Sequence, residues 1–315
     1  MYTREIFSTV KEIIDKRREA AQAEADRREA AVRAKSGVIR EIDDELAGTG
    51  LLIFKTAVSG GDIAPIKARN VLLMEKRAEE LARLGLPADY TDPQYVCKKC
   101  SDSGYDKEGV MCACMRELLK LESIKASGIG RLIEKQSFEN FDLSWYAEGE
   151  ERDRMRSNAE AAKAFADNFT AHSGENLLLV GKTGTGKTHL SSAIAKTVIE
   201  KGYSVLYDST QNILSAFETD KFRTGYGAYE PKSDKYFDTD LLILDDLGAE
   251  FSSQFTVSCL YNLLNTRQNR GLSTVISTNL SPEELSRKYE DRIFSRLMGE
   301  DTKILLFVGK DHRIG

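Results

Sequence analysis

The sequence predicts an α/β protein with a five-stranded parallel sheet, preceded by a helical N-terminal module and a small cysteine-rich segment. Three observations predict this arrangement. Short apolar runs alternate with amphipathic helical stretches from about residue 136, a glycine-rich loop follows one of those runs, and four of the five cysteines lie between positions 97 and 114. Continuous apolar runs are typical of parallel strands that helices cover on both faces.

The composition excludes several classes of protein. The 315 residues include 45 Lys and Arg against 50 Asp and Glu, a net charge of −5, which excludes a protein that coats nucleic acid by bulk positive charge. No stretch approaches the roughly 20 apolar residues that span a bilayer, and the N-terminus lacks the pattern of a signal peptide. We therefore expect a cytoplasmic protein with no membrane partner.

We expect residues 1–90 to form a helical docking module for a partner protein. Residues 1–36 contain no Gly or Pro and are rich in Ala, Glu, Arg and Lys, with opposite charges three and four positions apart. Such a stretch buries little apolar surface by itself, so it forms either a solvated helical hairpin or a docking element for a partner helix bundle. We favour docking, because a charged, Ala-rich element adds little to catalysis.

Turn residues predict the boundaries inside this module. Gly48 and Gly50 predict a turn between two apolar helical stretches. Asp62 and Pro65 predict the start of a further helix, because Asp caps helix N-termini and the missing N–H of Pro costs nothing in the first turn. That helix is expected to run to about Leu84, where Gly and Pro stop it.

Residues 91–135 are expected to hold a four-cysteine zinc-binding segment and a linker helix. Cys97 and Cys100 form one pair, and Cys112 and Cys114 form a second pair 11 residues further on. An odd cysteine count crowded into one short segment does not indicate a disulfide framework. Four thiolates at this spacing close a tetrahedral Zn²⁺ site with no open position, which makes the site structural.

Two alternatives stay open for these cysteines: unliganded or redox-active pairs, because C-x-C is less common than C-x-x-C, and an iron–sulfur cluster. The fifth cysteine, Cys259, lies in an apolar helical stretch and is expected to be a buried core thiol. Ser127, Gly128 and Gly130 indicate a hinge before the sheet-forming part.

Residues 136–315 are expected to form the sheet and its covering helices. Their apolar runs are short, and helical stretches separate them, as in a parallel sheet with crossover helices. The five predicted strands are Leu177–Val180, Tyr203–Tyr207, Leu241–Leu244, Thr274–Thr278 and Ile304–Val308.

Residues 181–188 read GKTGTGKT and fit the phosphate-loop pattern G-x-x-x-x-G-K-[ST]. An apolar strand precedes them and a helix follows, which distinguishes a phosphate loop from a flexible Gly/Thr turn. The glycines allow backbone N–H groups to surround phosphate oxygens, and the helix N-terminus adds partial positive charge. The expected nucleotide-binding residues are Gly181, Lys182, Thr183, Gly184, Thr185, Gly186, Lys187, Thr188 and His189.

The chemistry of this site is expected to need a cation, two carboxylates and a magnesium ion. Lys187 should place its ammonium near the β and γ phosphates of ATP, and the Thr188 hydroxyl should ligate Mg²⁺. Residues 241–246 read LLILDD, an apolar strand with two carboxylates at its C-terminal end, where ligands of open α/β sheets bind. Asp245 is therefore expected to hold Mg²⁺, directly or through water, and Asp246 to orient and deprotonate the attacking water.

Polar and cationic residues later in the chain complete the expected catalytic set. Asn279 follows the predicted strand TVIST, and its amide is expected between the two carboxylates and the γ-phosphate. Arg292 and Arg296 lie four apart on one face of a predicted helix, and Arg313 lies just past the last strand. Charge that develops on the γ-phosphoryl group needs cationic partners, and an arginine can come from a neighbouring subunit.

The segments GKTGTGKTHL, LLILDDLGAE, VISTN and RIFSRLMG together resemble the AAA+ ATPases of the bacterial replicative helicase loaders, the DnaC/DnaI type, and their relative IstB, an insertion-sequence helper. The SFENF stretch at 137–141 is similar to the lead-in that precedes the ATPase core in that group. The resemblance covers residues 136–315 and extends, less specifically, over the cysteine segment and the N-terminal helices.

The resemblance implies an AAA+ core without the helical lid of many AAA+ proteins. It implies that Asn279 acts as sensor 1, Arg296 as an arginine finger in trans, and Arg313 as sensor 2. It also implies that the protein associates with copies of itself and has two partners, a hexameric replicative DNA helicase and single-stranded DNA. One departure is Asp246, where the wider AAA+ pattern has the longer Glu. We therefore expect slow hydrolysis that DNA or a partner stimulates.

Six aromatic residues crowd positions 217–237, interleaved with Lys and Arg. Aromatic rings stack bases and cations hold phosphates, so this composition is typical of a single-strand-binding loop. A packed insertion with rings in the core and lysines at the surface explains it equally. The aromatic residues are Phe217, Phe222, Tyr226, Tyr229, Tyr236 and Phe237.

Together these features predict a protein that binds ATP, Mg²⁺ and Zn²⁺ and loads the replicative helicase onto single-stranded DNA during replication initiation or restart. The alternatives are an ATPase helper of a transposase, a P-loop kinase of a small molecule, and a non-hydrolysing, nucleotide-gated adaptor. The carboxylate pair, Asn279 and the paired arginines argue against the kinase. The separate N-terminal module argues against the transposition helper.

Overall fold

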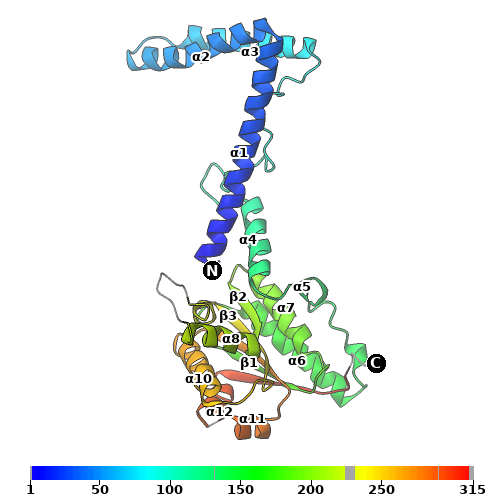
Figure 1. Cartoon of the computed structure of the whole chain (residues 1–315). Helices are drawn as coiled ribbons and strands as arrows, with labels where there is room; N and C mark the ends of the chain where they lie inside the picture. Colours follow the sequence, from blue (N-terminus) through cyan, green and yellow to red (C-terminus); the bar gives the residue numbers. More distant parts are fainter. Residues whose placement is uncertain (1, 131, 224–230, 290, 312–315) are drawn as a thin grey trace. The chain divides into compact units, whose positions relative to one another are not determined.

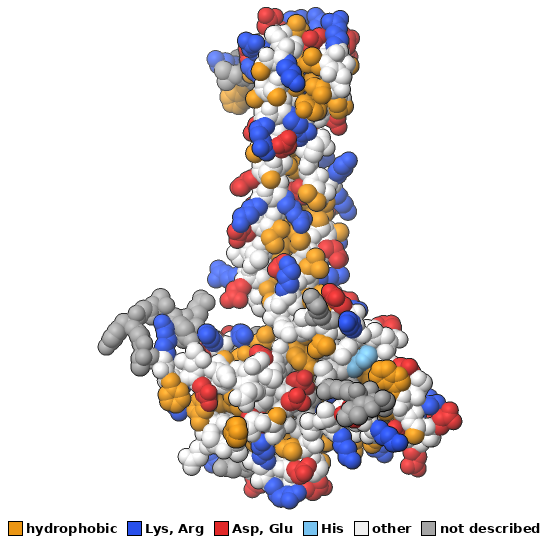
Figure 2. All heavy atoms as spheres, turned by 45° about the vertical axis from the view of Figure 1, so that its right-hand side comes forward, with side chains coloured by type: hydrophobic (Ala, Val, Ile, Leu, Met, Phe, Trp, Pro, Cys, Tyr) orange, Lys and Arg blue, Asp and Glu red, His pale blue; other side chains and the backbone are white. Residues whose placement is uncertain are grey.

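The computed structural model, traced in Figure 1, describes residues 2–130, 132–223, 231–289 and 291–311. The chain forms two compact units. The helical unit is Lys11–Arg116, and the sheet unit comprises Met1–Val10 and Glu117–Gly315. Figure 2 shows side chains of both charges interspersed over the visible surface, in line with the balanced composition. Within the described ranges, no helix is both long enough and apolar enough to cross a membrane.

The sheet unit contains the predicted five-stranded parallel sheet. The strands lie in the order β2-β3-β4-β1-β5, and each neighbouring pair is parallel. Parallel neighbours need crossover connections over a face of the sheet, which the intervening helices provide. All five predicted strands are confirmed, with ends that move by a few residues: β1 (Asn176–Gly181), β2 (Val205–Ser209), β3 (Leu241–Leu247), β4 (Ser273–Thr278) and β5 (Thr302–Phe307).

Helices cover both faces of this sheet (Figure 1). The first face packs against α6 (Glu150–Asn168) and α7 (Lys187–Glu200). The second face packs against α8 (Thr210–Lys221), α9 (Asp234–Asp238), α10 (Gln254–Asn269), α11 (Pro282–Lys288) and α12 (Asp291–Leu297).

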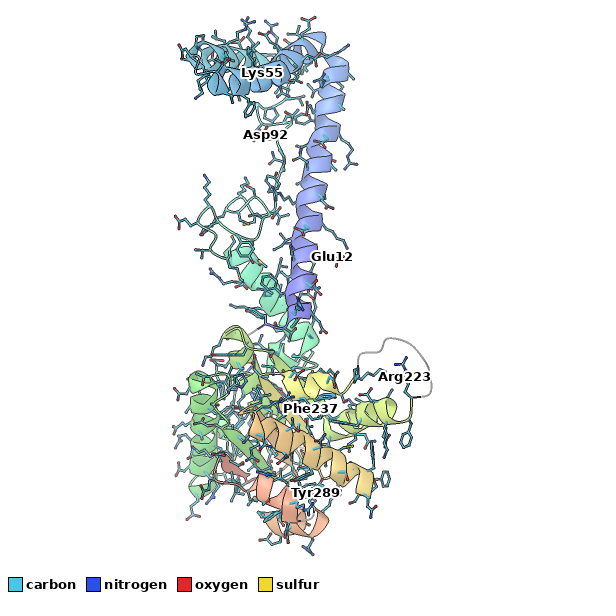
Figure 3. The ribbon with its side chains drawn as sticks, turned by 90° about the vertical axis from the view of Figure 1, so that its left-hand side faces the viewer. Glu12, Lys55, Asp92, Arg223, Phe237 and Tyr289 are labelled. Atoms are coloured by element: carbon cyan, nitrogen blue, oxygen red, sulfur yellow. The ribbon has the colours of Figure 1, made fainter. Side chains whose placement is uncertain are left out.

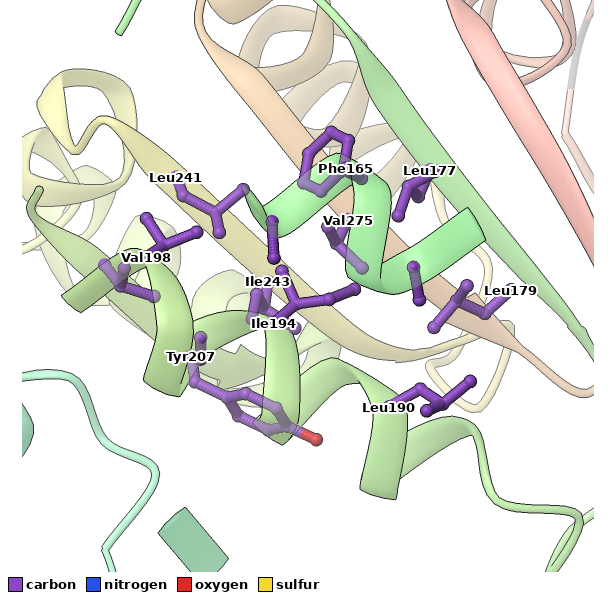
Figure 4. Packing of buried hydrophobic residues seen from close by; sticks show 14 of the residues in the cluster. Phe165, Leu177, Leu179, Leu190, Ile194, Val198, Tyr207, Leu241, Ile243 and Val275 are labelled. Carbon is purple, nitrogen blue, oxygen red and sulfur yellow. The ribbon is translucent and has the colours of Figure 1, made fainter. Parts of the chain in front are cut away.

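Alternation along each strand divides the core between the two faces, because successive side chains point in opposite directions. In β1, Leu177 and Leu179 join the first apolar cluster and Leu178 joins the second. Figure 4 shows the first cluster, in which Ile194 of α7 lies against Ile243 of β3. Each fully buried Leu or Ile stabilises the fold by about 1.5–3 kcal/mol relative to exposure, so the continuous apolar strands favour helices on both faces.

A fully buried arginine joins the second layer of helices to the sheet. The Arg267 guanidinium on α10 donates to the Thr274 hydroxyl at 3.1 Å and to the carbonyl oxygens of Tyr236, Thr239 and Ser273 at 2.6–2.9 Å. Burial lowers the pKa of Arg267 to about 9. These acceptors offset the loss of water around the charge, and they fix α9 and α10 beside β4.

The helical unit is built from long helices, as predicted. A break at Ser36 separates the first two, and the Ser36 hydroxyl caps the second by accepting a hydrogen bond from Ile39 N at 3.3 Å. The second and third helices pair through an ion pair in which Arg77 Nε lies 2.7 Å from Asp43. The helices are α1 (Arg4–Lys35), α2 (Gly37–Val58), α3 (Ala64–Arg83) and α4 (Ala113–Ala126), of which α1 and α4 continue into the sheet unit.

The turn predicted at Gly48 and Gly50 is wrong, because α2 runs through both positions. A helical glycine costs about 1 kcal/mol relative to Ala, and the packing of α2 against α3 outweighs that cost. The predicted start of the next helix is close to the observed one. The Asp62 carboxylate accepts a hydrogen bond from Ala64 N at 2.8 Å, in the first turn of α3.

The cysteine segment up to Arg116 belongs to the helical unit. Packing explains this grouping. A Cβ built on Gly104 would lie 3.4 Å from Ile14 of α1 and 2.8 Å from the Met115 sulfur. The segment therefore shares apolar contacts with α1 instead of forming a unit of its own.

The predicted hinge after α4 is fixed to the sheet. Tyr207 N of β2 donates a hydrogen bond to Ser127 O at 2.6 Å. A Cβ on Gly128, whose φ is 79°, would lie 2.4 Å from Tyr207 O, so only glycine allows this close approach. The contact covers part of the edge strand β2, whose backbone groups would otherwise be unpaired.

We expect Gly48→Ala and Gly50→Ala each to raise the free energy of unfolding by about 1 kcal/mol, because alanine favours the helix more than glycine does. A Cβ at either position would meet no atom within 4 Å, so the added methyl group strains nothing. Chemical denaturation of the full chain measures the change.

Gly60→Ala is the matched control. A Cβ there also meets no atom within 4 Å, but the φ of 73° is strained for any residue with a side chain, so this variant should be less stable than the wild type. A destabilised Gly48→Ala protein would contradict a continuous α2.

Candidate functional site

A cavity of about 500 Å³ lies where the phosphate loop leads from β1 into α7. The ends of β3 and β4 border it, together with the segment that precedes α6. The structure thus brings together Lys187, Thr188, Asp246 and Asn279, as the sequence predicts. The cavity is lined by Lys135, Gln136, Asn140, Phe141, Asp142, Trp145, Tyr146, Thr183, Gly184, Gly186, Lys187, Thr188, His189, Asp246 and Asn279.

Lys187 is buried, and its ammonium donates to three acceptors. These are Gly181 O at 2.5 Å, Lys182 O at 2.8 Å and Asn279 Oδ1 at 2.7 Å. Three hydrogen bonds use the full donor capacity of an ammonium group, which a buried charge requires. The side chain of Lys187 therefore joins the phosphate loop to the end of β4.

Gly186 closes the phosphate loop in a conformation that other residues avoid. Its φ is 93°, and a Cβ would lie 2.6 Å from the Tyr146 hydroxyl and 3.0 Å from the Phe141 ring. The Tyr146 hydroxyl also donates to Thr185 O at 3.1 Å. The loop is therefore held on one side by aromatic residues from the segment that precedes α6.

Asp245 is held by side chains from both neighbouring strands. It accepts a hydrogen bond from the Tyr207 hydroxyl of β2 at 2.6 Å and another from the Ser277 hydroxyl of β4. Burial and the charge of Asp245 raise the pKa of Tyr207, so the phenol stays protonated and donates. This linked set of carboxylate and hydroxyl oxygens fits a hard cation such as Mg²⁺, which prefers oxygen ligands.

Asp246 lies in a β-bulge that separates it from Asp245. The register of β3 against β4 shifts between Leu244 and Leu247, and Asp246 has a left-handed φ of 55°. Its backbone N–H donates to the Ser277 hydroxyl at 3.1 Å. Asp246 is exposed and lines the cavity, whereas Asp245 is half-buried. The bulge thus gives two consecutive carboxylates different surroundings.

Sequence reasoning misses Tyr207, Ser277 and Gln136 at this site. Tyr207 and Ser277 lie inside runs that read as apolar strands, and their polar atoms are the signal that was available. A hydroxyl in a buried strand needs a hydrogen-bond partner, which here is a carboxylate of the neighbouring strand β3.

Arg296 lies away from this cavity. Its NH1 donates to Gln268 Oε1 at 3.2 Å, and both residues line a small second cavity near the start of β1. The phosphate loop follows the opposite end of β1, so Arg296 and the phosphate loop lie at opposite ends of this strand. Arg313 falls outside the described residues. Asp311, two positions before it, lies against Gly184 of the phosphate loop.

The four clustered cysteines come together in the helical unit. Their sulfurs all lie within 4.8 Å of one another, with Cys97 and Cys112 at 3.8 Å and Cys100 and Cys114 at 3.5 Å. Zn–S bonds of about 2.3 Å in tetrahedral geometry place sulfurs about 3.8 Å apart. The spacing therefore fits a metal ion with four thiolate ligands.

The turn beside this cluster is held by a buried carboxylate. Asp102 accepts hydrogen bonds from the backbone amide of Cys97 at 2.9 Å and from the amide before it at 2.8 Å. Burial disfavours the Cys100 thiolate, but hydrogen bonds from the Gly104 backbone and from neighbouring sulfurs lower the pKa of Cys100 to about 7. Burial and the Cys100 sulfur raise the pKa of Cys114. A shared cation removes this competition for protons, because it deprotonates the thiols that it binds.

The aromatic residues at 217–237 divide between core and surface. Phe217 and Phe237 pack edge-on with ring centroids 5.6 Å apart, and Tyr236 is buried. In Figure 3, Phe237 lies within the sheet unit and Arg223 lies at its periphery. Phe222 is 70% exposed. The packed interpretation therefore holds for three of the rings, and two positions lie outside the described residues: Tyr226 and Tyr229.

The family model described as "IstB-like ATP binding protein" matches residues 118–300. This range lies within the sheet unit and includes the phosphate loop, both carboxylates and Arg296. The helical unit, with its four cysteines, lies before the matched range.

Two curated proteins show how far the similarity extends. The replicative helicase loader DnaC of Escherichia coli (strain K12) is 26% identical over 182 residues, which are 58% of this chain and 71% of DnaC. A putative insertion sequence ATP-binding protein of Sinorhizobium fredii is 33% identical over 137 residues, which are 44% of this chain and 45% of that protein.

Two solved structures align with the same part of the chain. A crystal structure of DnaI aligns with a TM-score of 0.48 and 22% identity, over 59% of this chain and 95% of the DnaI chain. A crystal structure of the DnaC helicase loader aligns with a TM-score of 0.46 and 23% identity, over 54% of this chain and 98% of that chain.

We expect the purified full chain to carry about one divalent metal ion at the four-cysteine cluster. Cys97→Ser should lower the metal content several-fold, because three thiolates cannot complete the tetrahedron. Elemental analysis by plasma mass spectrometry measures the ion and identifies it.

Cys259→Ser is the matched control, and this variant should keep its metal. Cys259 is half-buried against the second apolar cluster of the sheet unit, more exposed than the core thiol that the sequence predicts. A metal content that Cys97→Ser leaves unchanged would rule out the cluster as the binding site.

Proposed function

Because this chain belongs to the IstB-like ATP-binding family, as a DnaC/DnaI-like AAA+ ATPase, we propose that it loads a replicative DNA helicase onto single-stranded DNA during replication initiation or restart. One observation carries the proposal. The chain combines an ATP-type cavity, in the part that the family model matches, with a separate helical unit that has exposed apolar side chains. The DnaC relative is named as a replicative helicase loader.

The proposed ATP chemistry uses the residues around the cavity. The loop amides and Lys187 bind the phosphates, and Thr188 and Asp245 hold Mg²⁺, which neutralises phosphate charge when bound. Asp246, exposed to the cavity, orients the attacking water and accepts its proton. Asn279 acts as sensor 1, since its amide oxygen already lies 2.7 Å from the Lys187 ammonium. The shorter second carboxylate makes hydrolysis slow until DNA or the helicase stimulates it.

The hairpin of α2 and α3 is the proposed docking surface for the helicase. Six of its exposed apolar side chains lie toward the turn, three from Leu52 to the end of α2 and three from Val71 to Met74 near the middle of α3. Exposed apolar side chains of this size mark interaction sites. We define this hairpin patch as Leu52, Phe54, Val58, Val71, Leu72 and Met74.

A surface at the end of α8 is the proposed contact with single-stranded DNA. The Lys221 ammonium lies 5.4 Å from the centroid of the Phe222 ring and 4.4 Å from that of Phe255. Phe251, four residues before Phe255 in the sequence, is 93% exposed. Exposed rings stack on bases and a lysine among them binds phosphate, in agreement with one of the two interpretations of this region.

The four-cysteine cluster is proposed to hold Zn²⁺ in a structural role. A closed set of four thiolates leaves no position for substrate, so the ion stabilises the turn between α3 and α4. Reduced thiols that bind zinc belong to a reducing compartment, in which the proposed partners also act, and we propose a cytoplasmic location.

We expect this protein to co-elute with the host replicative helicase in size-exclusion light scattering with ATP and Mg²⁺. Phe54→Ser combined with Met74→Ser should weaken the complex at least about tenfold, because it removes two large apolar contacts from the hairpin patch. Loading onto single-stranded DNA, measured by helicase unwinding, should fall in parallel, and Lys187→Ala should abolish loading.

Leu121→Ser is the matched control for the hairpin patch, because Leu121 is an exposed leucine on α4 outside it. This variant should keep the complex. If the wild type forms no complex with the helicase but binds duplex DNA and a transposase, the insertion-sequence role named for the Sinorhizobium fredii relative replaces loading. ATP binding without phosphate release would instead indicate a nucleotide-gated adaptor.

Arg296 is proposed to act as an arginine finger on the neighbouring subunit's ATP. Lys187→Ala and Arg296→Ala should each lower DNA- and helicase-stimulated phosphate release by about 10³-fold or more. A mixture of the two variants should recover part of the activity, because some interfaces then combine an intact Lys187 with an intact Arg296. Phosphate release of each protein and of the mixture measures this.

Arg292→Ala is the control on the same helix, since Arg292 is exposed four residues before Arg296. This variant should retain most of the activity. Full activity of Arg296→Ala, or an inactive mixture, would contradict a finger in trans.

A further inference from the structure

The phosphate loop forms only one side of the 500 Å³ cavity. The other side comes from residues 135–146, here called the lead-in wall, which follow α5 (Leu132–Lys135) and include the short helix η1 (Leu143–Trp145). When the triphosphate binds the loop, as proposed above, the nucleoside extends along the lead-in wall. The inference about this wall therefore rests on the proposed ATP site.

The lead-in wall is fixed to the start of α7. His189 Nε2 lies 2.9 Å from Ser137 O and 3.0 Å from Asn140 Oδ1, so this nitrogen carries the proton and donates. The Asn140 amide is oriented on both sides, because its oxygen accepts from Ser137 N at 2.8 Å and its nitrogen donates to Lys135 O at 2.7 Å. The Phe141 ring packs edge-on against His189. The wall thus forms before a base arrives.

Gln136 brings a buried acceptor to this wall. Its backbone N–H donates to Leu132 O at 2.8 Å, which fixes the residue at the end of α5, and its side chain lines the cavity. Its Oε1 atom is buried and has no hydrogen-bond partner within the described part of the chain. Most buried polar atoms in proteins have a partner, and a buried acceptor without one costs free energy. A donor on a bound molecule would satisfy it.

We propose that Gln136 selects adenine by accepting a hydrogen bond from the N6 amino group of the base. Adenine presents a donor at this position, whereas guanine presents an oxygen acceptor. With guanine, the Gln136 oxygen would face the 6-oxygen in the orientation that the structure shows, and the amide would have to turn over to donate a hydrogen bond. Phe141 and Trp145 in the same wall supply aromatic surface for the base.

The single tryptophan of the chain, Trp145, lines the cavity, so its fluorescence reports binding without a label. The full chain is titrated with ATP and with purine riboside triphosphate, which lacks the 6-amino group. We expect the wild type to bind ATP about tenfold more tightly than the analogue, the effect of one hydrogen bond to a buried acceptor. Calorimetry with unlabelled nucleotide provides a second measurement.

Three variants separate base selection from structure. Gln136→Met has a similar shape but no acceptor, so it should weaken ATP binding to the level of the analogue and leave the analogue unchanged. Gln136→Glu retains an acceptor, so the ratio of the two affinities should persist. Gln254→Met, at an exposed glutamine that begins α10, should leave the ratio at the wild-type value.

Two results would overturn the inference. One is equal affinity of the wild type for ATP and the analogue, and the other is equal weakening of the binding of both by Gln136→Met. Either result would contradict base selection by Gln136 without contradicting the ATP site. A wild-type chain that gives neither a fluorescence change nor heat with ATP would overturn the ATP site and this inference with it.

Discussion

The candidate ATP site depends on the alignment of three parallel strands. β1, β3 and β4 end at one edge of the sheet, with Val180 and Leu247 both paired to Thr278. Each strand delivers a different group there: the phosphate loop, the two carboxylates and Asn279. Because the strands are parallel and adjacent, residues as far apart in the sequence as Lys187 and Asn279, 92 positions, meet at this edge. The Lys187 ammonium, which bonds to two loop carbonyls and to Asn279, closes this arrangement.

The bulge in β3 gives a physical reason for the Asp-Asp pair. A residue with a side chain loses roughly 1–2 kcal/mol in the left-handed region, and Asp and Asn enter it more readily than Glu does. Asp246 occupies this region with a φ of 55°. The backbone therefore favours the short carboxylate at the position where the wider AAA+ pattern has Glu. Asp245, in regular register before the bulge, is held by Tyr207 and Ser277 and has little freedom to move.

Local patterns predict the parts of this protein that local chemistry determines. The five strands, the phosphate loop and the cysteine pairs could be located from the sequence, because strand burial, loop geometry and ligand spacing leave short-range signals. The prediction of a turn at Gly48 and Gly50 is wrong, because packing between helices outweighs the low helix propensity of glycine. The hydroxyl of Tyr207 in an apolar strand indicates that it has a partner, but neither that partner nor the role of Gln136 could be assigned, since the groups around them are far away in the sequence. The strand order β2-β3-β4-β1-β5, which no single segment encodes, creates those neighbours.

Tyr207 belongs to two parts of the sheet unit at once. Its hydroxyl donates a hydrogen bond to Asp245, at the proposed magnesium position. Its backbone N–H bonds to Ser127 O, directly after α4. α4 begins at Ala113, beside Cys114, so a continuous stretch of the chain leads from the cysteine cluster to Ser127. Two hydrogen bonds of a single residue therefore join the Asp245 carboxylate to Ser127, the residue that follows α4.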